Sequence, residues 1–414
     1  MQNGIFTEAD LLLPDFQKTD GSRYAVIACD QFTSEPLYWE EAERLVADAP
    51  STLGMILPEC YLALREEKIP AINRTMESLL AEGFFLSYPQ SILYLCRTLP
   101  DGRIRRGLVG ACDLEAYGFL PEDRLPIRAT EGTVLERIPP RVEIRRDAPL
   151  ELPHVMLLMD DREDTVFSRV VRTEEDRPLY DFPLMAEGGH VRGYLLTDDE
   201  KAAIDKALSA LSVKDETGAP LLFAVGDGNH SLATAKTCYT ELKARIGAEA
   251  AARHPARYAL VELVNLHDEA LDFEPIFRVV MGADADDLVA SLRDYTERAA
   301  DASLGTADFT VIAAGHEEKL TLKGTHVQPV GTLQAFLDVY TAAHPEVTVD
   351  YIHDEDSLRA LSVREGAVGF LFRGMKKEDL FPAILRSGPL PRKTFSMGHA
   401  RDKRYYLEAR RIRP

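Results

Sequence analysis

The residues best suited to chemistry lie together in one short stretch, Gly226-Asp227-Gly228-Asn229-His230-Ser231. The two glycines let the backbone adopt positive φ and approach a ligand closely. The carboxylate of Asp227 could hold a divalent metal or accept a proton, and the next three side chains add polar groups. This combination favours a site for the phosphate of a nucleotide or a phosphorylated metabolite.

The stretch is framed by elements that would hold it in place. The apolar run at 221–225 predicts a buried strand, and residues 232–246 predict a helix with one apolar face. The N-terminus of such a helix offers free N–H groups and a partial positive charge to an anion. A tight turn with a satisfied histidine is the structural alternative. We favour a site because four polar side chains share one turn between a strand and a helix.

Familiar nucleotide-binding templates do not match this turn. The chain has no G-x-x-x-x-G-K-[ST] sequence, so a standard P-loop is not expected. The spacing of Gly226 and Gly228 resembles the dinucleotide fingerprint, but Ser231 replaces its third glycine.

Three further groups of polar residues are candidates. Asp30, Gln31, Thr33 and Glu35 follow a predicted strand at 24–29, where they could form part of an active site or cap a helix. Arg128 and Arg137 lie in an arginine-rich stretch and could clamp an anion or form structural ion pairs. Lys393 could contact an anion or lie in a polar connection.

Composition excludes several classes of protein. The 414 residues carry a net charge of −20, which disfavours nucleic acid as a partner. No apolar run is long enough to span a bilayer, and the N-terminus does not resemble a signal peptide. The five widely spaced cysteines predict reduced thiols and argue against a structural zinc site. We expect a cytoplasmic protein.

The order of predicted elements indicates an α/β fold, in the sense of an α+β mixture. Strands are predicted at 91–98 and 105–113 as a hairpin, at 155–159 and at 258–264, and a capping box at Thr197 predicts a helix. We expect an N-terminal lobe, residues 1–255, that carries the turn, and a C-terminal α/β lobe, residues 256–414.

At the turn, and over most of its length, the chain resembles the domain of unknown function 1015 family, in a clostridial-type branch. Members carry Ala-Asp-Gly-His-His-Arg between a strand and a helix. The resemblance also covers the blocks 24–39, 107–136, 266–279, 349–354 and 391–398. Asn229, Ser231 and Phe277 replace the histidine, arginine and histidine that are usual in the family. This branch has therefore changed the chemistry, or those residues are not essential.

A more distant similarity is to the ParB/sulfiredoxin superfamily, whose free-serine kinases hold nucleotide phosphates in an Asp-Gly-His-His-Arg turn. The resemblance implies a similar fold around the strand–turn–helix unit. By analogy, the turn from Gly226 to Ser231 would hold phosphate, and Glu35 would be the general base.

These observations lead to the hypothesis of a phosphoryl-transfer enzyme that acts on a small hydroxylated metabolite, in its concrete form a nucleotide-dependent free-serine kinase. Asp227 would hold Mg²⁺, ATP or ADP would be the co-substrate, and Glu35 or His230 would take the hydroxyl proton. The expected phosphate ligands are Gly226, Gly228, Asn229, Ser231, Arg128, Arg137 and Lys393.

Two alternatives stay open at this point. One is a phosphatase of a small phosphorylated metabolite, which needs similar groups with water as the acceptor. The other is a non-catalytic nucleotide- or metabolite-binding regulator of ParB-like type. The sequence does not address the oligomeric state.

Overall fold

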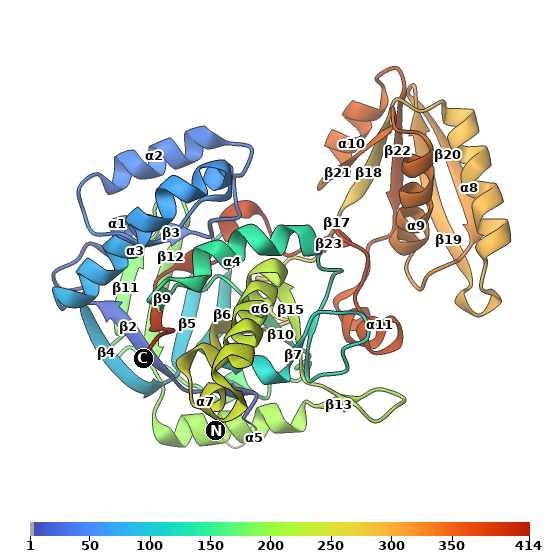
Figure 1. Ribbon diagram of the computed structural model, residues 1–414. Helices are drawn as coiled ribbons and strands as arrows, with labels where there is room; N and C mark the ends of the chain where they lie inside the picture. The colour runs from blue at the N-terminus through green and yellow to red at the C-terminus, as the bar shows by residue number, and fades with distance from the viewer. Residues whose placement is uncertain (1–3) are drawn as a thin grey trace. The chain divides into compact units, whose positions relative to one another are not determined.

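The computed structural model describes residues 4–414, which form two compact units (Figure 1). Unit 1 comprises the chain up to Leu271 together with His399–Pro414, and unit 2 comprises Asp272–Gly398. The expected boundary after residue 255 precedes β16 (Tyr258–Asn265), which lies in the middle of the unit 1 sheet between two other strands. The chain therefore leaves unit 1 only after this strand is complete.

Unit 1 is built on a ten-stranded mixed sheet with the order β11-β12-β5-β6-β16-β10-β15-β8-β7, and β1 pairs with β6 beside this path. The pairs β10–β16, β15–β8 and β7–β8 are parallel, and the other pairs of this sheet are antiparallel. The strands are β1 (Phe6–Thr7), β5 (Leu93–Thr98), β6 (Ile104–Asp113), β7 (Tyr117–Gly118), β8 (Ile127–Ala129), β10 (Met156–Met159), β11 (Tyr180–Pro183), β12 (His190–Leu195), β15 (Phe223–Asp227) and β16.

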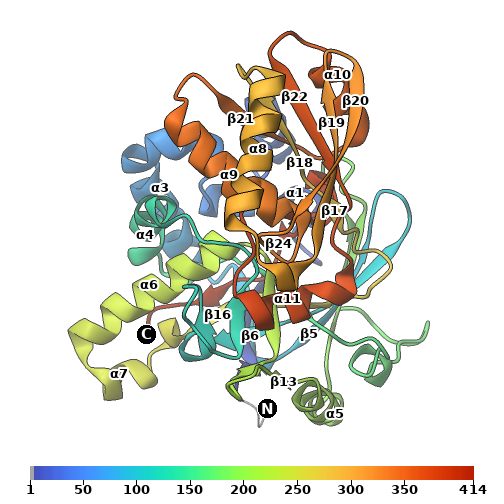
Figure 2. The same cartoon turned by 90° about the vertical axis from the view of Figure 1, so that its right-hand side faces the viewer.

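Helices cover this sheet, and α6 lies beside α4 in Figures 1 and 2. The helices are α1 (Gly21–Tyr24), α2 (Pro36–Val46), α3 (Arg65–Ala81), α4 (Ile138–Arg146), α5 (Asp198–Ala210), α6 (Asn229–Ile246) and α7 (Ala248–Ala252). Short two-stranded pairs join β2 (Ala9–Pro14) to β4 (Phe85–Ser91), β13 (Val213–Lys214) to β14 (Pro220–Leu221), β24 (Tyr405–Tyr406) to β3 (Val26–Ile27) and β25 (Arg410–Arg411) to β9 (Leu150–Glu151).

Unit 2 has its own five-stranded antiparallel sheet, order β20-β19-β22-β18-β21, and its own apolar core. The elements are β17 (Glu274–Pro275), β18 (Phe277–Met281), α8 (Ala285–Ala299), β19 (Thr306–Ala313), β20 (His316–Lys323), α9 (Pro329–Ala343), β21 (Thr348–Ile352), α10 (Glu355–Ser362), β22 (Ala367–Phe372), α11 (Leu380–Ser387) and β23 (Phe395–Ser396). Figure 2 shows α8 and α9 packed beside each other. The predicted α/β mixture with a second α/β lobe is therefore confirmed.

Several local predictions are confirmed. The hairpin β5–β6 and the capping box between Thr197 and Glu200 are present. The proline- and arginine-rich segment 126–153 contains β8, α4 and β9, because prolines at the start of α4 are compatible with a first helical turn. The last residues of the chain form two short strands, β24 and β25.

The five cysteines are free thiols, in agreement with the sequence. Over residues 4–414, no helix is long and apolar enough to cross a membrane.

Buried charges hold the C-terminal segment, residues 399–414, inside unit 1. The fully buried guanidinium of Arg404 donates to Glu262 on β16 at 2.6 Å and also to Glu408. Glu408 accepts a second hydrogen bond from the Tyr180 hydroxyl at 2.7 Å. Because each buried charge has a close partner, these contacts fix the position of the segment against the sheet.

Replacing Arg404 by Met is expected to lower the free energy of unfolding of unit 1 by about 3–5 kcal/mol, because two buried carboxylates lose their closest cationic partner. Urea denaturation followed by the fluorescence of Trp39 measures this, since Trp39 is the single tryptophan and lies buried in unit 1. The matched control is Arg401→Met in the same segment. Its side chain is 50% exposed beside Glu187, so its loss should stay below about 1 kcal/mol. Equal losses for both variants would contradict the structural role of Arg404.

The free energy of unfolding of unit 1 should also depend on pH through the protonation of Glu262. Burial disfavours its charged form, but the guanidinium groups of Arg105 and Arg404 outweigh that effect and hold its pKa below the usual 4.5. The folded form therefore binds fewer protons than the unfolded chain. The resulting stabilisation is complete above about pH 4.5 and is lost as the pH falls through the folded pKa.

In the variant Glu262→Gln, whose amide does not titrate, the unfolding free energy should fall less steeply below pH 4.5. The slope should differ from the wild type by up to about 1.4 kcal/mol per pH unit. The same Trp39 denaturation curves, recorded from pH 7 to pH 3.5, give both slopes. Identical slopes would show that Glu262 has no depressed pKa.

Candidate phosphate-binding site

The predicted strand–turn–helix unit is present as β15, Gly228 and α6. β15 lies between β10 and β8 in the sheet, which fixes where the strand ends. Gly228 has φ 78° and ψ 28°, a left-handed conformation that glycine adopts without strain. A Cβ atom at this position would lie 3.0 Å from both Cα and Cγ2 of Val155. A glycine is therefore required at position 228 by the backbone conformation and by the close approach of Val155, just before β10.

The first turn of α6 has no negative charge and no capping side chain. The first hydrogen bond within the helix runs from the Leu232 N–H to the Gly228 carbonyl at 3.0 Å. The amides of the preceding residues have no partner within the helix by geometry, and they carry the positive end of the helix dipole. This end of an 18-residue helix is suited to an anion.

Asp227 closes β15 and faces a lysine from the C-terminal segment. Its Oδ2 lies 3.5 Å from Nζ of Lys403, and both side chains are largely buried. Within the described residues, Oδ2 of Asp227 and Oδ1 of Asn229 are buried oxygens that accept no hydrogen bond. The Asn229 amide nitrogen lies 3.4 Å from the Thr130 hydroxyl. Two buried oxygens that accept no hydrogen bond therefore flank Gly228, and of these the Asp227 oxygen also faces the ammonium group of Lys403.

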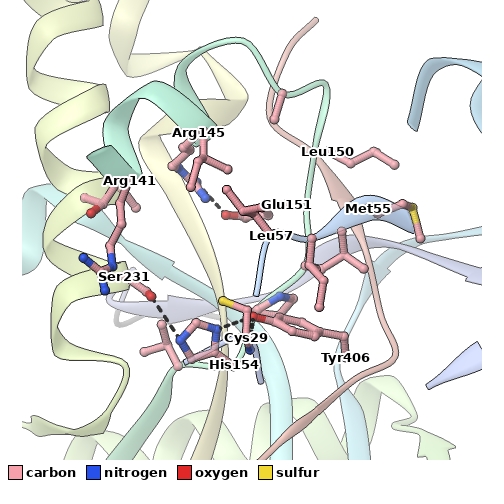
Figure 3. Close-up of a pocket in the computed structure, with 18 of the residues that line it drawn as sticks. Cys29, Met55, Leu57, Arg141, Arg145, Leu150, Glu151, His154, Ser231 and Tyr406 are labelled. Atoms are coloured by element: carbon pink, nitrogen blue, oxygen red, sulfur yellow. Dashed lines mark hydrogen bonds and ion pairs between the residues drawn. The ribbon is translucent and has the colours of Figure 1, made fainter. Parts of the chain in front are cut away.

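His154 connects the turn to two other segments, as Figure 3 shows. Its Nε2 lies 3.0 Å from Oγ of Ser231 and 3.6 Å from Oδ2 of Asp30, and its Nδ1 lies 2.7 Å from the Tyr406 hydroxyl. The Tyr406 oxygen already accepts a hydrogen bond from the backbone N–H of Cys29 at 3.2 Å. We infer that Tyr406 donates its hydrogen to Nδ1, which places the His154 proton on Nε2.

This arrangement differs from a Ser-His-Asp triad. In a triad the carboxylate binds the ring nitrogen opposite the serine. Here Ser231 and Asp30 both face Nε2 of His154. With the proton on Nε2, the serine oxygen accepts from His154, and its own hydrogen is available to a ligand. The geometry fits ligand binding by Ser231 rather than its activation as a nucleophile.

Asp30 carries negative charge at this site. Burial disfavours its ionisation, but the His154 ring, a hydrogen bond from Gln31 and the charge of Lys403 outweigh burial and lower its pKa below the usual 3.8. The Gln31 hydrogen bond measures 2.9 Å. Asp30 is therefore a carboxylate at neutral pH.

The other predicted residues lie in different surroundings. Nε2 of His230 accepts a hydrogen bond from the Val134 N–H at 3.3 Å. Glu35 is exposed at the start of α2, on the same loop as Asp30. Arg128 is buried and pairs with Asp215 at 3.2 Å, in the ion-pair arrangement that the sequence left open.

Arg137 and Lys393 are both exposed. Arg137 lies just before α4, where its carbonyl accepts a hydrogen bond from Arg141. Lys393 belongs to unit 2, where its carbonyl accepts from Arg278. Their roles as phosphate ligands stay predictions.

Sequence reasoning missed His154, Lys403 and Tyr406. None of them lies in a motif, and they reach the turn only through long-range contacts. The family block 107–136 does contain Thr130, but only the parallel pairing of β8 with β15 shows that this residue adjoins the turn.

The chain matches the family described as "Protein of unknown function (DUF1015)" over residues 15–340, and it belongs to this family. The resemblance stated from the motifs is thereby confirmed. Comparison with curated proteins finds no match.

Solved structures with some similarity include a conserved hypothetical protein from Pyrococcus furiosus, with 11% identity, 73% of this chain and 94% of that chain covered and a TM-score of 0.37. A free serine kinase variant in complex with ADP has 10% identity, 75% and 93% coverage and a TM-score of 0.40. SbnI from Staphylococcus aureus has 8% identity, 70% and 82% coverage and a TM-score of 0.34. At these values we draw no functional inference from the structures.

Replacing Gly228 by Ala tests the geometry of the turn. The left-handed conformation alone costs an alanine about 1–2 kcal/mol, and crowding against Val155 adds to that loss. Gly83 is the control, since it also has a positive φ of 67° but open space around its Cβ position. Urea denaturation followed by Trp39 should show a larger loss for Gly228→Ala than for Gly83→Ala. Equal losses would mean that Val155 does not constrain the turn.

Proposed function

For this member of the DUF1015 family, we propose a phosphoryl-transfer enzyme that acts on a small hydroxylated metabolite, with a nucleotide as phosphate donor. The concrete form is a kinase of a free hydroxy amino acid such as serine. The observation that carries the proposal is the uncapped N-terminus of α6, where left-handed Gly228 lies between two buried acceptor oxygens. An anion would meet backbone N–H groups there, and a cation would meet the oxygens.

The charges around the turn suit a phosphate that is accompanied by a metal. Lys403 supplies one positive charge, and the Nε2–H of His154 and the hydroxyl of Ser231 supply donors. Asp30 and Asp227 would repel a bare phosphate, because like charges at short range are unfavourable. A magnesium ion held by Asp227 would remove this repulsion.

The residues present fit Mg²⁺ in the manner usual for phosphate substrates. Mg²⁺ prefers oxygen ligands and is commonly held by one or two carboxylates together with substrate phosphates. Asp227 and Asn229 would hold it with their unused oxygens. Over the described residues there is no group of three or more His, Cys, Asp or Glu side chains that could form an all-protein metal site. When bound, the ion would neutralise charge on the transferring phosphoryl group.

The protein residues would position the reactants and move one proton. The α6 amides, Lys403 and Ser231 would orient the phosphates, which supplies much of catalysis in phosphoryl transfer. Asp30 is a carboxylate that lies beside the turn through its contact with His154. We therefore assign it the role of the base that takes the proton of the acceptor hydroxyl. Glu35, on the same loop, stays a predicted base, and His230 is engaged with Val134.

The thermal stability of unit 1 tests this function. The protein is heated with ATP, ADP, CTP, serine or phosphoserine, each with and without Mg²⁺, and Trp39 fluorescence reports unfolding. A ligand at a hundredfold excess over its Kd stabilises the folded form by about 2.7 kcal/mol, which corresponds to several degrees in Tm. We expect a nucleotide-dependent rise that Mg²⁺ increases.

Variants locate the binding site. Asp227→Ala should abolish the effect of Mg²⁺, and Lys403→Met should reduce the nucleotide shift. Lys18→Met is the control, since Lys18 pairs with Asp15 at the surface and should leave the shift unchanged. A turnover assay then separates a kinase, which forms ADP only with a hydroxylated acceptor, from a phosphatase, which releases inorganic phosphate. No shift with any nucleotide or phosphorylated ligand would overturn the proposal.

A further inference from the structure

A pocket of about 160 Å³ adjoins the turn and is lined by Ser231 of the turn and by His154, which contacts Ser231. Further walls come from α3, α4, α6, β9, β16 and the segment that leads from Met55 to Glu59. Figure 3 shows Ser231 and His154 on one side of the pocket, with Met55 and Leu150 on the opposite side. The pocket therefore has one polar end, which faces the turn, and an apolar interior.

The interior is lined mainly by large apolar side chains: Met55, Leu57, Ile72, Met76, Leu150 and Leu260. These residues are buried, and both methionines have flexible thioether side chains that adapt to the shape of a bound group. Protein interiors normally leave few voids larger than a water molecule. An apolar space of this size next to a reactive site is therefore a feature that a ligand would use.

The four charged side chains that line the pocket are already paired. Arg141 contacts Glu59, and Arg145 donates to Glu151 at 2.5 Å. A polar or charged substituent that entered the interior would lose its hydration without gaining these partners. An apolar substituent has no hydrogen bonds to water to lose, and it gains contact with the walls of the pocket.

We propose that this pocket binds an apolar group of the substrate, which narrows the proposed substrate class to small hydroxylated metabolites that carry an aliphatic or aromatic part. The substrate's hydroxyl or phosphate lies at Ser231 and His154, and its apolar part extends toward Leu57 and Met76. An apolar cavity of about 150 Å³ in another protein accommodates benzene, so a group of about six carbons fits here. This inference rests on the proposed phosphate site for the orientation of the substrate.

Alkyl phosphates test the pocket, with affinities measured by calorimetry in the presence of Mg²⁺. The probes are methyl, butyl and hexyl phosphate, together with hexanol as a probe that lacks the phosphate. Each added methylene that enters an apolar pocket should raise the affinity about fourfold until the space is filled. Hexyl phosphate should therefore bind at least tenfold more tightly than methyl phosphate.

Two variants change the volume of the pocket. Ala148 is buried and lines it, so Ala148→Leu should remove the advantage of hexyl phosphate and the binding of hexanol, and leave methyl phosphate unchanged. Met76→Ala should enlarge the space and extend the gain to chains longer than hexyl. It also keeps the test valid if Ala148→Leu does not fold, and Trp39 fluorescence reports folding in both variants.

The outcomes separate the two proposals. Equal affinities for methyl and hexyl phosphate, with no binding of hexanol, would overturn the apolar pocket and leave the phosphate site intact. Binding of hexanol that Ala148→Leu abolishes, without any binding of methyl phosphate, would support the pocket and overturn the phosphate site. In Lys403→Met, all three phosphates should lose affinity by a similar factor while hexanol is unaffected.

Discussion

The candidate site depends on one buried interaction, the contact of Arg404 with Glu262 and Glu408. Apolar packing alone would hold the C-terminal segment against the sheet without a unique position, because hydrophobic contacts have little directionality. A guanidinium between two carboxylates has a strongly preferred geometry. This contact fixes the C-terminal segment at Arg404. Lys403 precedes Arg404 in the sequence and Tyr406 follows it, and both reach the turn.

The candidate site would bind an anion mainly through its backbone geometry rather than through net positive charge. Lys403 stands against Asp30 and Asp227 in a chain of net charge −20, so the surroundings do not attract anions by charge alone. The N–H groups of the first turn of α6 offset this, because they point at one place and need no rearrangement to bind. A metal accompanying the phosphate would fit this balance. The neutral, apolar pocket beside it would then contribute selectivity more than attraction.

The sequence predicts elements with local signatures well and predicts their assembly poorly. The hairpin of β5 and β6, the capping box at Thr197 and the strand–turn–helix around Gly228 each depend on neighbouring residues, and all are present. The site needs contacts of another kind. His154 is 77 residues from Ser231 and 252 from Tyr406 along the chain. No spacing rule describes such pairs, because they arise from strand order in the sheet and from the return of the C-terminal segment.

The division of the chain between the two units has a consequence for its synthesis. Unit 2 is continuous in sequence, whereas unit 1 is interrupted by it and needs residues 399–414 to complete its buried charges. A ribosome makes these residues after all of unit 2, so Glu262 leaves the ribosome well before its partner Arg404. Until then unit 1 lacks Lys403 and the closer of the two guanidinium groups that face Glu262. Unit 1 therefore acquires its complete site only after the segment that follows unit 2 has been made.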